Sequence, residues 1–101
     1  MKMLMHVILP IEPFNSLQRA GRVGQMMQKI IEDTKPESVY FTEHDGNRGA
    51  TMVINVNKES DIPFYAEPWF LQFEANCEFR IMMTPSDLQN ANLDELASKW
   101  G

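Results

Sequence analysis

The sequence has few of the features that mark secreted, membrane-spanning or nucleic-acid-binding proteins. Cys77 is its only cysteine, so no internal disulfide can form, as expected of a cytoplasmic protein. No apolar run approaches the roughly 18 residues that span a bilayer, so we expect no membrane partner. The opening stretch "MKMLMHVILPIEPF" is interrupted by His6, Pro10 and Glu12, and no small-residue cleavage site follows. A signal peptide is therefore not expected.

Positive charge is also scarce. Lys and Arg number 9 against 14 Asp and Glu, and the formal net charge is −5. An acidic surface repels phosphate backbones, so we expect no nucleic-acid partner. The stretch "RGATMVIN" partly matches the third-strand motif of RNA-recognition domains. However, Ala50 and Met52 stand where that motif needs stacking aromatic residues.

What remains is the composition of one globular domain. The chain has 101 residues, of which 44% are hydrophobic and 23% charged. These values suit one modest hydrophobic core. With no repeat and no linker, the sequence predicts a single domain over residues 1–101.

Hydrophobic patterning and turn residues predict the order of the elements. Strands are expected at residues 3–9, 38–44, 49–56 and 77–84. One helix should run from a cap at Asn15 or Ser16 to about Thr34, and another over residues 61–74. The capping patterns "TPSD" and "NLDE" predict two short helices near the C-terminus. The order β-α-β-β-α-β with a helical tail is the α+β, ferredoxin-like arrangement: an antiparallel four-stranded sheet with helices on one face.

Three local features refine this prediction. Pro68 should kink or break the second helix near Glu67, because it removes an internal hydrogen bond. Residues 3–9 are apolar at nearly every position, so both faces of that strand should be buried. The first helix should present one apolar stripe whose small residues allow a close approach to the sheet: Leu17, Ala20, Gly24, Met27 and Ile31.

Side-chain alternation divides each strand into an apolar set, placed under the helices, and a mixed set. A hairpin loop of two or four residues pairs Tyr40 and Thr42 with Thr51 or Val53, which keeps the two sets apart. The stretch "TEHDGNRGAT" then reads mainly as a turn, with Glu43 and Arg48 as an exposed pair. The mixed face should carry His6, Tyr40, Thr42, His44, Thr51, Asn55, Glu78 and Arg80 among apolar residues.

That face is too apolar for free exposure and too polar for a plain core. Two such sheets packed face to face would bury the apolar members and enclose the polar ones. The sequence therefore predicts a homodimer through the open sheet face, with an interior cavity for a small-molecule ligand.

At this level the sequence resembles the dimeric α/β-barrel proteins of the ferredoxin-like class, and within them a group of small uncharacterised bacterial proteins. The stretches that carry the resemblance are "KPESVYFTEHDGNRGATMVINV", "AEPWFLQFEANCEFRIMMTPSDL" and "AGRVGQMMQKI". The wider superfamily includes cofactor-independent oxygenases, isomerases, haem-degrading enzymes and ligand-binding modules. The resemblance thus implies a fold and an assembly, and leaves the reaction open.

Two functional hypotheses follow. In the first, the protein is an enzyme without a cofactor that acts on an aromatic or enolisable substrate. His6 is the general base, while Arg80 and Tyr40 bind the resulting anion. Thr42, His44, Thr51, Asn55, Glu78 and Trp69 contact the substrate. Trp69 belongs to an aromatic segment that forms either core or a wall over the pocket mouth. In the second hypothesis, the same face is the interface of a non-catalytic binding or structural dimer.

Other chemistries fit the sequence poorly. Haem ligation would need a histidine on a helix, as in the haem-degrading relatives, whereas His6 and His44 lie in predicted strands. His6, His44 and Glu78 have no metal-site spacing, so no metal is expected. Cys77 should lie on the helix side of the sheet and His6 on the other, which argues against a nucleophile pair and for a buried thiol.

Overall fold

The computed structural model, which describes residues 1–101, contains one antiparallel sheet of four strands. The strands are β1 (Lys2–Leu9), β2 (Ser38–His44), β3 (Asn47–Asn55) and β4 (Asn76–Ile81), in the spatial order β2-β3-β1-β4. The two central strands, β1 and β3, pair with each other and with one edge strand each. All four predicted strands are present, although β4 ends at Ile81 rather than at residue 84.

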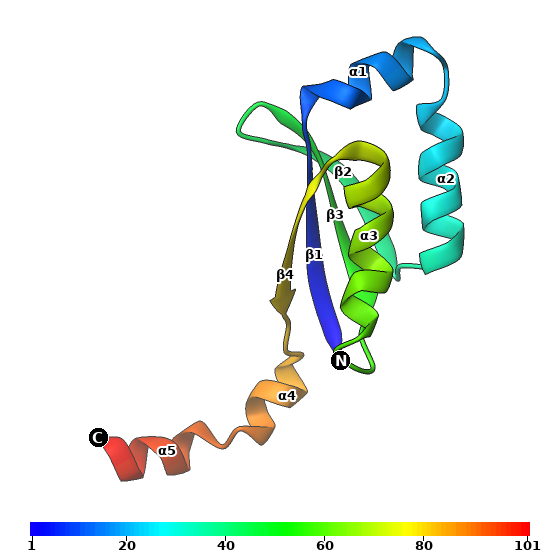
Figure 1. Cartoon of the computed structure of the whole chain (residues 1–101). Helices are drawn as coiled ribbons and strands as arrows, with labels where there is room; N and C mark the ends of the chain where they lie inside the picture. The colour runs from blue at the N-terminus through cyan, green and yellow to red at the C-terminus, as the bar shows by residue number, and fades with distance from the viewer.

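Three helices lie against one face of this sheet: α1 (Ile11–Arg19), α2 (Val23–Thr34) and α3 (Asp61–Phe73). Two more, α4 (Pro85–Asn90) and α5 (Leu93–Trp100), follow β4 and extend away from it (Figure 1). The protein is therefore an α+β fold of the predicted ferredoxin-like order, with the first helical connection divided in two. None of the five helices combines the length and apolarity that crossing a bilayer requires.

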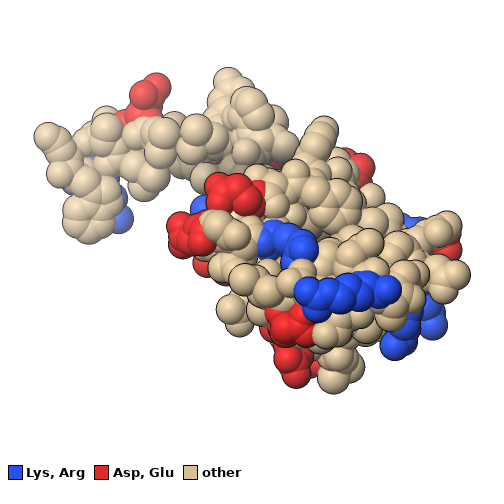
Figure 2. All heavy atoms as spheres, turned by 90° about the horizontal axis from the view of Figure 1, so that it is seen from above, with Lys and Arg blue, Asp and Glu red and all other residues tan.

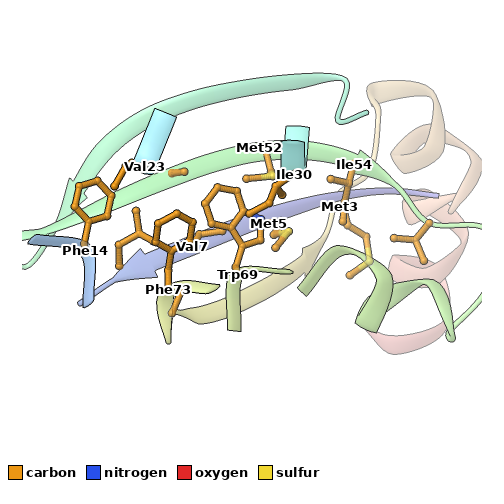
Figure 3. Packing of buried hydrophobic residues seen from close by; sticks show 14 residues of the cluster. Met3, Met5, Val7, Phe14, Val23, Ile30, Met52, Ile54, Trp69 and Phe73 are labelled. Atoms are coloured by element: carbon orange, nitrogen blue, oxygen red, sulfur yellow. The ribbon is translucent and has the colours of Figure 1, made fainter. Parts of the chain in front are cut away.

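The core lies between the sheet and the three covering helices. Residues of β1 alternate between buried and half-buried, and Met3, Met5, Val7 and Leu9 point toward the helices. They pack with Phe14, Val23, Ile30, Met52, Ile54, Trp69 and Phe73 (Figure 3). Complete burial of one large apolar side chain contributes about 1.5–3 kcal/mol. The prediction that both faces of β1 are buried was wrong for the single chain, because its helices cover only one.

The first helical segment differs from the prediction. It divides at Gly21, whose φ is +70°, a conformation that glycine adopts without a Cβ clash. The amide of Gly21 donates to the carbonyl of Gln18, and that of Arg22 to the carbonyl of Leu17. This is the hydrogen-bond pattern of a Schellman helix end. The predicted stripe is present only in part. Leu17 and Met27 pack against the core, whereas Gly24 is exposed and a Cβ there would meet no atom within 4 Å.

The predicted caps of that helix, Asn15 and Ser16, lie inside α1. Glu12 has extended backbone angles, and its carboxylate accepts from the backbone amide of Ser16 at 3.1 Å and from the Ser16 hydroxyl. A side-chain oxygen thus satisfies an orphan donor of the first turn, but it comes from a glutamate four residues earlier.

Helix α3 runs through Pro68 without a break, so of the kink or break expected near Glu67 the break is absent. A proline inside a helix costs about 3 kcal/mol. Burial of Trp69 and Phe73 on the following turn offsets that cost, since removing a core Phe or Trp side chain costs about 3–5 kcal/mol. Tyr65 also packs against the core, whereas Phe70 is exposed.

The β2–β3 hairpin closes through a two-residue turn, Asp45 and Gly46, with φ of +49° and +83°. Positive φ at both positions is what a type I′ turn requires. The register pairs Tyr40 with Thr51 and Phe41 with Ala50, which confirms the predicted even-length connection. Glu43 and Arg48 are cross-strand neighbours but form no ion pair. The Arg48 guanidinium lies 4.1 Å from the centre of the Phe14 ring instead.

Residues 82–101, which we call the C-terminal arm, project from the end of the sheet (Figure 1). The predicted capping box is present in α4: Asp87 donates its amide to the Thr84 hydroxyl and accepts from the Thr84 amide. From Met83 onward every hydrogen bond is internal to the arm. The radius of gyration is 17.2 Å, whereas a compact chain of this length has about 13 Å.

Candidate functional site

The face of the sheet that carries no helix, which we call the open face, presents the mixed set of side chains. On the central strand β1 it carries Leu4, His6 and Ile8, all half-buried. The register aligns His6 with Thr51 on one side and with Glu78 on the other. The strand-face assignment made from alternation is therefore confirmed for the central strands and for β4.

A hollow of about 250 Å³ lies on the open face. Its lining comes from all four strands and is mostly polar: Leu4, His6, His44, Thr51, Glu78 and Arg80. Five of these six were predicted as site residues from the sequence. The hollow has room for a small organic acid or a single substituted ring, and is at or below the low end of ordinary ligand pockets.

His6 is held at the centre of this hollow by two hydrogen bonds. Its Nδ1 lies 3.0 Å from the Thr51 hydroxyl, and its Nε2 lies 3.2 Å from Nδ1 of His44. The two imidazole rings are tilted by 57° with centroids 5.0 Å apart. Nε2 of His44 in turn lies 3.5 Å from a carboxylate oxygen of Asp45. The result is a line of four polar groups from three strands and a turn.

Gly49 lies beside the histidine pair. It is on β3 between Ile8 of β1 and Thr42 of β2, on the same face as the histidines. A Cβ at this position would lie 3.2 Å from the Val7 carbonyl oxygen and 3.6 Å from Cε1 of His6. The first distance is a tight contact with the β1 backbone, and the second is ordinary van der Waals contact with the His6 ring.

Glu78 and Arg80 form the opposite wall of the hollow, on the edge strand β4. Both are exposed, and neither makes a salt bridge within the chain. A guanidinium without an ionic partner beside a polar hollow is suited to binding a planar anion.

Four of the predicted site residues lie outside the hollow. Tyr40 and Thr42 are on the open face but exposed, Tyr40 by 70%, and neither lines the hollow. Asn55 is exposed near the end of β3, where its carbonyl accepts from the Tyr65 hydroxyl. Trp69 is 1% exposed and lies in the core on the helix side of the sheet. A Trp69 wall over the hollow is therefore excluded by the sheet between them.

Sequence reasoning did not assign Asp45 to the site. It was read only as a turn residue, and its carboxylate now lies beside His44. The available signal was its place directly after a histidine of the mixed face, at the first position of a tight turn. Leu4, the one apolar residue of the lining, was expected on this face but had no assigned role.

Metal and thiol chemistry find little support in the geometry. No three His, Cys, Asp or Glu side chains are grouped so that they could hold a metal ion. Cys77 pairs with Val7 on the helix side of the sheet and packs against the core. Burial raises the pKa of its thiol from 9.0 to about 12, so the nucleophilic thiolate is disfavoured.

The chain matches no protein-family model, and no curated protein matches it in sequence. Among solved structures it is similar to the de novo designed protein Ferredog-Diesel, with 10% sequence identity and a TM-score of 0.45. The similarity covers 80% of this chain and 85% of the designed chain. The fold assignment rests on the strand order and register described above.

Proposed function

We propose that the protein is a homodimer that binds a small anionic ligand in the hollow of the open face and abstracts a proton from it without a cofactor. The observation that carries the proposal is that His6, Thr51 and Arg80, from three different strands, line one hollow. A base and an unpaired guanidinium on opposite walls suit a substrate that becomes an enolate or phenolate.

Each wall has a distinct task in this proposal. Arg80 binds the carboxylate or developing oxyanion of an aromatic or enolisable substrate, and His6 is the base, acting on the side nearer β3. Proton removal is the first step of an isomerisation and of a cofactor-independent oxygenation. Tyr40, the third group proposed from the sequence, is a cross-strand neighbour of Thr51 but lies outside the hollow, so Thr51 and His44 replace it here.

The homodimer follows from the composition of the open face. Leu4, Ile8 and Val53 are half-buried on it, and Tyr40 is exposed. Packing two open faces together would remove these apolar groups from water and would close the hollow above His6. This is the dimeric α/β-barrel arrangement that the sequence resembles.

The C-terminal arm supports the same assembly. Met82 is half-buried and every other residue of the arm is exposed. Helix α5 carries Leu93, Leu96 and Trp100 along one side. Figure 2 shows a largely uncharged arm surface. Helices of six and eight residues are marginal in water without tertiary contacts. Because the arm leaves on the side away from α2 and α3 (Figure 1), we propose that it packs against the second copy.

Light scattering after size-exclusion chromatography tests the assembly, and a dimer at micromolar concentration is expected. Thermal-shift screening with small carboxylates, keto acids and phenols tests the ligand class. A ligand at 100 times its Kd stabilises by about 2.7 kcal/mol, which raises Tm by several degrees. Arg80→Gln should abolish the thermal shift, whereas Arg19→Gln, at an exposed position of α1, should leave it unchanged. A stable monomer, or a shift that survives Arg80→Gln, refutes the proposal.

A non-catalytic binding or structural dimer is the second candidate. The observation that favours it is that both ring nitrogens of His6 already have partners within the chain. In other proteins, a polar network whose groups are all hydrogen-bonded can serve only to rigidify the structure and specify a unique packing, without any catalytic role. A crystal structure of the dimer separates the two candidates: side chains interdigitated over His6 with no void favour the structural role.

A further inference from the structure

The two hydrogen bonds of His6 change how it could act as a base. Nδ1 is occupied by Thr51 and Nε2 by His44, at 3.0 and 3.2 Å. His6 and Thr51 both line the hollow, so a ligand there finds both His6 nitrogens already occupied and the Thr51 side chain beside them. A proton that passes from Thr51 to His6 binds to Nδ1 of His6. His6 can then release its other proton from Nε2 to His44.

The Asp45 carboxylate, at the far end of the line from Thr51, determines which nitrogen of each imidazole ring carries the proton. An ionised carboxylate only accepts, so Asp45 favours a proton on Nε2 of His44. Nδ1 of the neutral His44 ring is then an acceptor for Nε2–H of His6. Nδ1 of His6 is in turn an acceptor for the Thr51 hydroxyl proton. One tautomer, with the proton on Nε2, satisfies both rings at once.

Exposure increases along the same line. Thr51 and His6 are half-buried at the hollow. The His44 side chain is 40% exposed and that of Asp45 is 90% exposed, at the tip of the hairpin. The line therefore begins at two residues of the hollow and ends at an exposed carboxylate.

We propose that Thr51, His6, His44 and Asp45 form a proton relay, with Thr51 as the group that receives the proton from the ligand. This inference rests on the proposed function and names the residues that carry its proton. As the ligand C–H or O–H bond breaks, its proton bonds to Thr51 Oγ and its electron pair stays on the ligand. The Thr51 hydroxyl proton moves to Nδ1 of His6, and the Nε2 proton of His6 moves to Nδ1 of His44.

The step transfers one proton from the ligand to the protein and needs no oxidant or reductant. The ligand gains one negative charge beside Arg80, and His44 becomes an imidazolium beside the Asp45 carboxylate. Glu78 and Arg80 are the charged groups that face His6 from β4. Glu78, the direct cross-strand neighbour of His6, favours a positive charge on His6 and Arg80 opposes it, whereas on His44 the charge lies beside the Asp45 carboxylate. His44 and Asp45 are thus positioning residues, and Thr51 is the catalytic residue.

Nuclear magnetic resonance of uniformly ¹⁵N-labelled protein without ligand tests the relay directly. At about pH 8.5, where imidazole is ordinarily neutral, both rings should carry their proton on Nε2. A through-hydrogen-bond N–N coupling should link Nε2 of His6 to Nδ1 of His44. On acidification, the ¹⁵N signals of both rings should shift in one step, because two protonated rings would oppose N–H groups across the contact.

Matched variants separate relay from orientation. His44→Asn keeps an acceptor oxygen near the position of Nδ1 but cannot take a proton, so His6 should keep its tautomer and shift alone on acidification. His44→Phe should lose both properties. Asp45→Asn suits the same turn without the charge and should draw the added proton back toward His6. Thr51→Val should remove the hydroxyl partner of Nδ1, and Thr51→Ser should restore it.

The relay is overturned if the wild-type protein shows no N–N coupling, or if the two rings shift in separate steps that His44→Asn leaves unchanged. These measurements need no ligand, so they fail independently of the proposed function. Ligand-induced stabilisation that requires Arg80, with uncoupled histidines, would retain the site and reject the relay. Coupled histidines in a protein that binds no small acid would retain the hydrogen-bonded pair but reject the proposed function, and with it the proton transfer from a ligand.

Discussion

His6 contacts His44 across the backbone of Gly49, with the facing ring nitrogens 3.2 Å apart. The two residues are separated by 38 positions in the chain and belong to strands that are not neighbours in the sheet. On the intervening strand, the residue beside the His6 ring is Gly49. The first prediction concerns that position.

Gly49→Ala should disrupt the histidine pair. The added Cβ would lie 3.2 Å from the Val7 carbonyl oxygen and 3.6 Å from His6 Cε1. Such overpacking costs about 1–3 kcal/mol, measurable as a lower urea midpoint together with loss of the N–N coupling. Gly24→Ala is the matched control, since its Cβ meets no atom within 4 Å on α2. It should stabilise the helix by about 0.5–1 kcal/mol. Equal effects of the two substitutions would contradict this account.

Removal of residues 83–101 should leave the sheet and the covering helices folded but weaken the dimer. The body loses no buried residue, because no residue from Met83 onward is buried. Trp100→Ala, which removes a side chain that is 78% exposed in the single chain, should raise the dimer Kd about tenfold, equivalent to about 1.4 kcal/mol. Sedimentation equilibrium measures this. Gln89→Ala on α4 is the control. An unchanged dimer Kd in the truncated protein would show that the C-terminal arm is not part of the dimer interface.

The Cys77 thiol should react slowly with thiol reagents in the native state and rapidly in urea. Its pKa is raised by burial to about 12. Because the folded pKa lies above the unfolded one, the stabilising contribution is fully present below about pH 9 and is lost as pH rises toward 12. Urea midpoints measured across that range should fall more for wild type than for Cys77→Ala. Fast native reaction at neutral pH would contradict the buried placement.

Acid should loosen α4 through Asp87. The Thr84 amide and then the Thr84 hydroxyl, as hydrogen-bond partners, lower the pKa of the Asp87 carboxyl. A lowered folded pKa means that the contribution is present above the ordinary Asp value of about 3.9 and is lost as pH falls through the folded value. The protection factors of the α4 amides, which are corrected for the pH dependence of intrinsic exchange, should therefore fall at low pH. Asp87→Asn should show low protection factors already at neutral pH, whereas Asp94→Asn, outside the capping box, should not alter those of α4.

The strand faces were predictable because two constraints act locally. Alternation assigns His6, Thr51, Glu78 and Arg80 to one face, and a two-residue turn allows only one pairing of β2 with β3. The capping box at Thr84 is equally local, since four consecutive residues supply both of its hydrogen bonds. Predictions of this kind depend on neighbours in sequence or on a single register.

The errors lie where packing or a single backbone angle decides. Pro68 stays in an unbroken helix because Trp69 and Phe73 on the next turn are anchored in the core. Gly21 ends α1 through a left-handed backbone angle, although the apolar spacing continued past it. Trp69 occupies the core instead of the hollow, since a helix on the other side of the sheet cannot reach the open face.

The sequence by itself determined the order of the elements and which side chains share the open face, because helix and strand periodicities are properties of consecutive residues. Only the tertiary structure decided that His6 hydrogen-bonds to both His44 and Thr51, that Asp45 ends their line, and that the arm leaves the body. These relationships depend on distances between strands and on the space at Gly49, which no pattern along the chain encodes.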